Sequence, residues 1–148
     1  GWPRGVPPMP TPEPAGWTGC ACRCSFFSAC AVTGITNSLL KSLIGRTRPR
    51  LFFDQGLYAF LPPARKALYV SMPSGHTAMM FAVATALALM LPRRWAAPAY
   101  ALATLIALSR VMTNAHWLAD ILAGALVGIG MTLLCHRSFV KRAWLMPK

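Results

Sequence analysis

The chain has 148 residues, of which 55% are hydrophobic and only 12% are charged, and its formal net charge is +12. A soluble domain usually carries about 25% charged residues, so this composition argues against a soluble protein. A strongly basic chain often binds nucleic acid. Here, however, the basic residues form short clusters between long apolar runs, which is typical of a polytopic membrane protein. Membrane lipids, rather than nucleic acid, are therefore the expected partner.

The first 24 residues differ from the rest of the chain. Six of the first fourteen are prolines, and the basic-then-apolar layout of a signal peptide is absent. The cysteines that follow are spaced C-x-C-x-C, which is not the usual spacing of a zinc site. We expect residues 1–24 to be a disordered or foreign leader and residues 25–148 to form a membrane-embedded domain.

Four apolar segments follow, at residues 25–40, 77–91, 96–108 and 117–135. A spanning helix needs roughly 20 residues, so the second and third segments span only with flanking residues. Buried core helices of a soluble bundle are the alternative, but short basic loops between four apolar runs favour membrane spans. Because lipid offers no hydrogen bonds to the backbone, we predict an all-α integral-membrane bundle with about four transmembrane helices. Gly124 and Gly128, spaced as GxxxG, would permit close helix packing.

If the four segments alternate in direction, one membrane face receives the ends of the first and third segments and the starts of the second and fourth. Seven basic residues lie on this face and eight on the other. If some of the seven basic residues bind a ligand, the second face becomes the more basic of the two. The positive-inside rule then makes the second face cytoplasmic. The first face is therefore expected outside the cytoplasm, in a bacterial inner membrane.

Residues suited to chemistry collect on this first face. Each has a structural interpretation as well, such as an interfacial anchor, a helix N-cap or a hydrogen-bonded pair on one helix. Those interpretations do not explain why all of these residues fall at one membrane level. In chain order they are Lys41, Arg48, Ser74, Gly75, His76, Arg110, His116 and Asp120.

Their residue types suit phosphoryl transfer. Lys41, Arg48 and Arg110 gather three positive charges where acids are few, and guanidinium forks match phosphate oxygens. A helix that starts at Ser74 and Gly75 would add backbone N–H groups for the same anion. A neutral imidazole can attack phosphorus, a carboxylate can orient it, and a second imidazole can protonate the leaving alcohol.

The spacing of these residues resembles the signature of the type 2 phosphatidic acid phosphatase superfamily, K-x6-R-P, P-S-G-H and S-R-x5-H-x3-D. The chain matches it as Lys41-x6-Arg48-Pro49, Pro73-Ser74-Gly75-His76 and Ser109-Arg110-x5-His116-x3-Asp120. The resemblance implies a phosphohistidine intermediate on His116, oriented by Asp120, with His76 as the general acid. It implies that Lys41, Arg48, Ser74, Gly75 and Arg110 hold the phosphate, that no metal cofactor is used, and that the site lies near one bilayer surface.

Membrane members of the family generally have six transmembrane helices with the motifs on the last four, so this chain resembles a member without its first two helices. Four alternatives to a lipid phosphatase stay open. One is an iron site made by His76, His116 and Asp120. The others are an inactive membrane protein that retains the motifs, a soluble vanadium haloperoxidase with a related anion site, and a phosphotransferase to another acceptor.

The expected substrate is a lipid phosphate or a polyprenyl pyrophosphate, because a membrane site favours an amphiphilic ester. Aromatic residues between positions 51 and 72 would overhang the site and contact the lipid, or serve as interfacial anchors. They are Phe52, Phe53, Tyr58, Phe60 and Tyr69.

Overall fold

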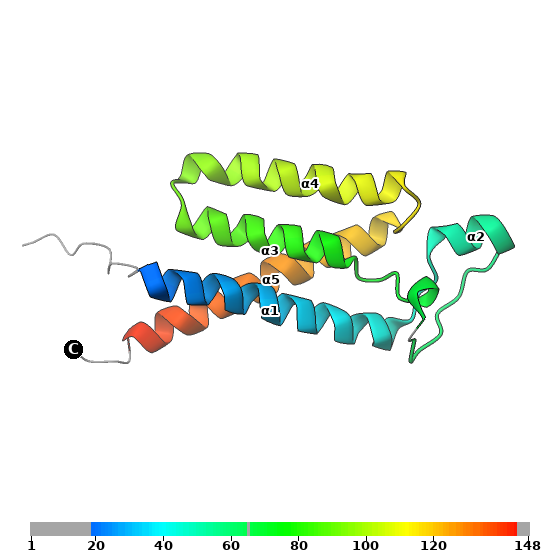
Figure 1. Cartoon of the computed structure of the whole chain (residues 1–148), viewed down its shortest axis with the longest axis horizontal. Coiled ribbons are helices and arrows are strands. Elements are labelled where there is room, and N and C mark those ends of the chain that lie inside the picture. Colours follow the sequence, from blue (N-terminus) through cyan, green and yellow to red (C-terminus); the bar gives the residue numbers. More distant parts are fainter. Residues whose placement is uncertain (1–18, 65, 145–148) are drawn as a thin grey trace, which may run out of the picture.

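The structure, a computed structural model, describes residues 19–64 and 66–144 and shows five α-helices, two short 3-10 turns and no strand in these residues. The long helices run along the long axis of the molecule, and a short helix lies with its loops at one end (Figure 1). The predicted all-α fold is confirmed. The elements are α1 (Gly19–Ile44), α2 (Pro49–Gln55), η1 (Ala67–Tyr69), α3 (Gly75–Met90), η2 (Arg93–Trp95), α4 (Ala96–Met112) and α5 (Leu118–Trp144).

The predicted apolar segments correspond to α1, α3, α4 and α5. Helix α1 begins at Gly19, six residues before the expected segment, so the end of the predicted leader is helical. Residues 1–18 of that leader lie outside the described residues. Among the described helices, three are long and apolar enough to cross a membrane, at Cys24–Ile44, Arg93–Met112 and Leu118–Lys141.

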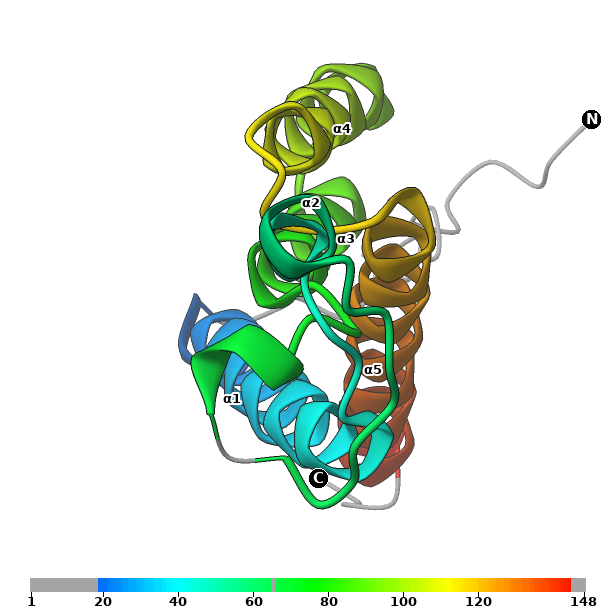
Figure 2. The same cartoon turned by 90° about the vertical axis from the view of Figure 1, so that its right-hand side faces the viewer.

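Helix α3 is shorter than the other three, with 16 residues. At about 1.5 Å per residue it spans roughly 24 Å. It packs against α1, α4 and α5, and the end-on view places it between α4 and the pair formed by α1 and α5 (Figure 2). The second predicted span, residues 77–91, is therefore a short central helix that is largely enclosed by its neighbours.

The bundle keeps its small residues inside and its large apolar residues outside. Ala78, Ala82 and Ala103 are buried, whereas Leu105 on α4 and Leu126 on α5 are 65% and 73% exposed. In water, so continuous an exposed apolar surface would be unfavourable. In lipid it is the expected outer face, with small residues allowing close approach between helices. The distribution supports a membrane helical bundle.

Glycines bring α5 directly against the backbone of α3. A Cβ atom at Gly124 would lie 2.6 Å from the carbonyl oxygen of Ser74, and one at Gly128 would collide with the carbonyl oxygen of Ala78. The close packing predicted from the GxxxG spacing is therefore present. It is extended by a hydrogen bond from Ser74 N–H to Asp120 O, 2.9 Å long, which joins the starts of α3 and α5.

The segment after α1 is fixed by backbone hydrogen bonds to two other parts of the loop. Gly45 has φ +63, and its carbonyl oxygen accepts from Leu61 N–H. Arg46 O then accepts from Ser71 N–H over 3.0 Å, and Arg48 N–H donates to Leu68 O over 3.0 Å. Helix α2 begins immediately afterwards with Pro49 at its first position, where proline is favourable because no N–H is needed.

Candidate active site

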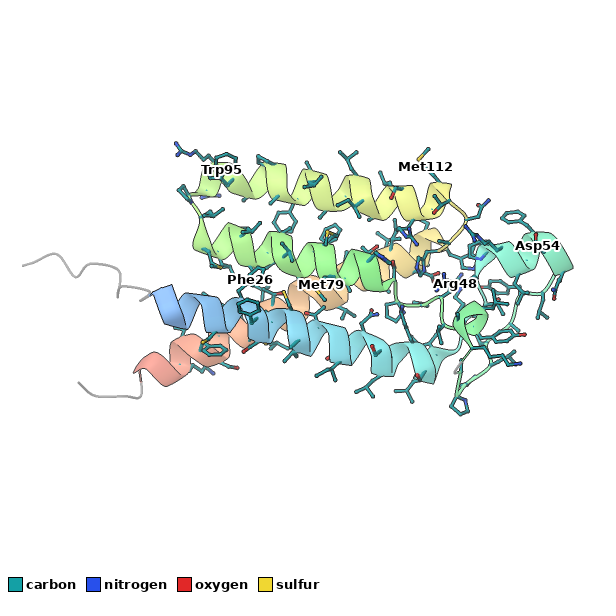
Figure 3. All side chains as sticks on the ribbon, viewed as in Figure 1. Phe26, Arg48, Asp54, Met79, Trp95 and Met112 are labelled. Carbon is teal, nitrogen blue, oxygen red and sulfur yellow. The ribbon has the colours of Figure 1, made fainter. Side chains whose placement is uncertain are left out.

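The predicted site residues come together at one end of the bundle. Helices α1 and α4 end there and α3 and α5 begin there (Figure 1). Arg48, between α1 and α2, lies at this end, and Trp95 lies at the opposite one (Figure 3). Alternating helix directions thus gather residues that are up to 79 positions apart in the chain, from Lys41 to Asp120.

His116 and Asp120, which we call the catalytic pair after the role expected from the sequence, are both buried. The side chain of Asp120 has 0% relative exposure and that of His116 has 3%. Asp120 Oδ2 accepts the backbone N–H of Trp117 over 2.9 Å. His116 Nδ1 lies 3.7 Å from the same oxygen, which is too long for a direct hydrogen bond.

The hydroxyl of Ser71 lies between the two members of the pair. It donates to Asp120 Oδ2 over 2.5 Å, and its oxygen lies 3.4 Å from His116 Nδ1. Since the single hydroxyl proton points to the carboxylate, the serine oxygen is available to accept from Nδ1–H. This arrangement favours the tautomer that carries its proton on Nδ1 and leaves the lone pair on Nε2, as a nucleophilic imidazole requires.

Arg46 pairs with the other oxygen of Asp120. Its Nη1 donates to Oδ1 over 2.7 Å, and both side chains are largely or fully buried. From the sequence, Arg46 is only one of the seven basic residues on this face, and no pattern singles out Ser71. The sequence did indicate that Asp120 needs a partner, because a carboxylate at the start of an apolar helix must be paired when it is buried.

The start of α3 is built to approach an anion. Ser74 is buried, and its hydroxyl accepts from Thr77 Oγ1 over 3.0 Å, which leaves its own proton to donate. The first N–H groups of a helix have no partner within it. A Cβ atom at Gly75 would lie 3.2 Å from Lys41 Nζ and 3.3 Å from Asn37 Nδ2, so glycine keeps room for both groups beside the helix start.

Lys41, Arg48 and Arg110, which we call the cation cluster, have no carboxylate partner among the described residues, whose only ion pairs involve Asp120. Arg110 Nε is buried without a hydrogen-bond partner. Arg48 Nε donates to Ala67 O over 2.8 Å. Burial, followed by the charges of Arg110 and Arg50, lowers the pKa of Arg48 from its ordinary value. Such a cluster fits a compact anion that accepts several hydrogen bonds.

His76 is exposed in the first turn of α3. The charges of Arg110, His116, Lys41 and Arg48 act on it, so it lies on the same side of the bundle as the cation cluster and the catalytic pair. No three His, Cys, Asp or Glu side chains in the described part of the chain lie together as a metal-ligand group. The iron site considered above, with His76, His116 and Asp120 as ligands, therefore has no geometric support.

Comparison with known proteins places residues 23–144 in one family. A family model of the PAP2 superfamily matches residues 23–144. The lipid A 1-phosphatase of Rhizobium etli is 37% identical over 108 residues, which are 73% of this chain and 46% of that protein. The lipid A 1-phosphatase of Rhizobium johnstonii is 36% identical over 115 residues, or 78% of this chain and 47% of that protein.

A plant protein gives a similar match. The probable lipid phosphate phosphatase 4 of Arabidopsis thaliana is 33% identical over 139 residues, with 75% of this chain and 45% of that protein covered. The chain thus spans about half the length of the curated relatives it matches. No solved structure gives a significant match.

Proposed function

Because the chain belongs to the PAP2 superfamily, we propose that it is a membrane phosphatase that hydrolyses a lipid phosphate through a phosphohistidine and without a metal. The observation that carries this proposal is the buried catalytic pair beside a cation cluster that has no carboxylate partner among the described residues. The pair supplies an oriented nucleophile, and the cluster supplies the charge that a phosphate and its transition state require.

The reaction has two steps. His116 Nε2 attacks phosphorus, the bond from phosphorus to the ester oxygen breaks, and His76 gives its proton to the leaving alcohol. Neutral His76 then takes a proton from water, whose oxygen attacks the phosphohistidine; the phosphorus–nitrogen bond breaks, and inorganic phosphate leaves. Lys41, Arg48, Arg110 and the N–H groups at the start of α3 stabilise the equatorial oxygens in both steps.

The substrate is a membrane lipid that carries a phosphate or pyrophosphate monoester. The relatives named lipid A 1-phosphatase make lipid A the first candidate. Phosphatidic acid, phosphatidylglycerol phosphate and a polyprenyl pyrophosphate are the others, since all present a phosphate at the end of an apolar anchor. The exposed aromatic side chains of Phe52, Phe53 and Phe60 lie in the segment around α2, where they would contact such a lipid at the interface.

Phosphate release from these four lipids, measured in detergent with EDTA present, tests the proposal. The wild-type protein is expected to release phosphate from at least one lipid, because no step above uses a metal. Loss of all release on chelation, with recovery when a divalent ion is restored, would contradict the metal-free mechanism. A folded wild-type protein without activity towards any lipid would favour the inactive alternative.

The same assay with Arg110→Ala tests the phosphate site. Removing charge-assisted hydrogen bonds worth about 1.5 to 3 kcal/mol should weaken inhibition by vanadate roughly 10- to 100-fold. Arg94→Ala is the matched control, because Arg94 is exposed at the other end of the bundle. Unchanged inhibition in Arg110→Ala would mean that the phosphate binds elsewhere.

We also propose a bacterial inner membrane location with the site on the extracytoplasmic side. At the site end, Arg46 is paired with Asp120 and the cation cluster is reserved for phosphate, which leaves Arg50 and Lys66 as the other exposed basic residues described there. At the other end, Arg93, Arg94, Arg137 and Lys141 are exposed, and this excess of unreserved positive charge is typical of the cytoplasmic side.

Cysteine labelling tests this orientation. Gln55→Cys at the site end and Arg94→Cys at the other end would each be introduced after the five native cysteines are replaced by serine. In intact spheroplasts, a membrane-impermeant maleimide is expected to label Gln55→Cys, and to label Arg94→Cys only after lysis. The opposite pattern would reverse the assigned sides.

A further inference from the structure

We propose that Arg46, which occupies one of the six unspecified positions of the K-x6-R-P motif, is a positioning residue that holds the catalytic pair in its reactive arrangement. This inference rests on the proposed function, since it concerns the same site. Three features carry it: the contact between Arg46 and Asp120, the aromatic surroundings of the guanidinium, and the backbone link from Arg46 to Ser71.

The carboxylate of Asp120 is held at both oxygens. Arg46 Nη1 donates to Oδ1 over 2.7 Å. Ser71 Oγ and the N–H of Trp117 both donate to Oδ2. Rotation of the carboxylate would break bonds on both sides. Without Arg46, a fully buried Oδ1 would lose its partner, and the carboxylate would turn or take up a proton instead of staying charged and oriented.

The guanidinium of Arg46 is itself fixed by aromatic side chains. Its central carbon lies 5.5 Å from the ring centroid of Tyr58, 5.8 Å from that of Phe60 and 5.5 Å from that of Trp117. Its Nη2 also donates to the hydroxyl of Tyr58 over 3.0 Å. These rings stabilise a buried cation. Arg46 is therefore held by the protein through Nη1, Nη2 and the three rings, although its Nε, like that of Arg110, is buried without a hydrogen-bond partner.

The backbone of Arg46 also contacts Ser71, whose side chain lies between the two members of the catalytic pair. Arg46 O accepts the N–H of Ser71 over 3.0 Å, and Ser71 Oγ lies between His116 Nδ1 and Asp120 Oδ2. One residue thus places both groups that adjoin Nδ1 of the nucleophile. A displacement of about 1 Å in such a group can lower a rate about 100-fold, so a positioning residue affects the chemical step more than substrate binding.

A double-mutant cycle with Asp120→Asn tests the proposal. Arg46→Met should lower kcat about 10- to 100-fold and leave KM and vanadate inhibition within about threefold of wild type. In the Asp120→Asn background the same change should cost less than about threefold, because the carboxylate that Arg46 positions is already gone. Arg46→Lys, which retains the charge, should recover part of kcat, and Arg94→Met is the exposed control.

Each other outcome has a definite meaning. A rise in KM and weaker vanadate inhibition would show that Arg46 binds the phosphate and would overturn positioning, as would equal losses of kcat in the two backgrounds. If Arg46→Met fails to fold because Asp120 is left buried and unpaired, the double variant, which buries no unpaired carboxylate, is compared with Asp120→Asn alone. Equal activity of those two proteins supports the proposal, and a further loss overturns it. Absence of phosphate release by the wild-type protein would instead count against the proposed function.

Discussion

Replacing His116 by alanine is expected to lower phosphate release by roughly 10⁴- to 10⁶-fold, the range seen when hydrolases lose the nucleophile of a catalytic set. The expected loss is this large because the change removes the atom that attacks phosphorus. The cation cluster and the helix start at Ser74 remain, so the lipid substrate should still bind. The effect should therefore appear in kcat, with KM nearly unchanged.

Trapping of the covalent intermediate checks the assignment of His116 as the nucleophile. Wild-type protein incubated with a lipid bearing a radioactive phosphate and quenched in alkali should carry acid-labile label, and His116→Ala should carry none. His136→Ala is the matched histidine control, since His136 lies towards the other end of α5 and should leave the label intact. Persistence of the label in a folded His116→Ala variant would assign the intermediate to another residue.

Gly128→Ala is expected to destabilise the folded protein by about 1 to 3 kcal/mol, the usual effect of forcing extra volume into a packed interface. In an ordinary helix position the same change stabilises by up to about 1 kcal/mol, because alanine is the better helix former. Here the added methyl group would meet the carbonyl oxygen of Ala78, and the backbone nitrogen of Ala82 lies 2.9 Å away. Both are backbone atoms, so the helices themselves would have to separate.

Gly130→Ala provides the control within the same helix, because nothing lies within 4 Å of a Cβ atom at Gly130. Thermal unfolding followed in detergent should show a lower midpoint for Gly128→Ala and an equal or higher midpoint for Gly130→Ala. Gly128→Ala should also lose activity, since α3 and α5 carry the two halves of the site. Equal midpoints for the two variants would mean that α5 does not pack on α3 through Gly128.

Much of the site could be predicted because helix directions alternate. Once residues 25–40, 77–91, 96–108 and 117–135 are identified as apolar, the ends that carry Lys41, His76, Arg110 and His116 must share one face. The last residues of α1 and α4 were less predictable, because apolar residues continue after Lys41 in α1 and after Arg110 in α4. The length of α3 was predicted well, but its enclosed position depends on the crossing of the other helices.

The contacts of Arg46 and Ser71 could not be predicted in the same way. Both residues lie in a loop segment, where neither the 3.6-residue period of a helix nor the alternation of a strand indicates which way a side chain points. Their positions depend on hydrogen bonds between parts of the loop, such as Ser71 N–H to Arg46 O. A carboxylate at the start of an apolar helix needs a cation, but several arginines lie on the same predicted membrane face and the sequence does not indicate which of them provides it.

The short length of α3 has a consequence for how a lipid reaches the site. Arg93 and Arg94 follow α3 closely and anchor that end at the headgroups. A helix of roughly 24 Å that starts from this level stops about 6 Å short of the far side of a hydrocarbon layer about 30 Å thick. The bilayer must thin around the site, or the phosphate must sink to meet it, so acyl chains need not be drawn out into water. Hydrophobic mismatch of this kind makes bilayer thickness a determinant of turnover, and activity should differ between vesicles of short-chain and long-chain lipids with the same headgroup.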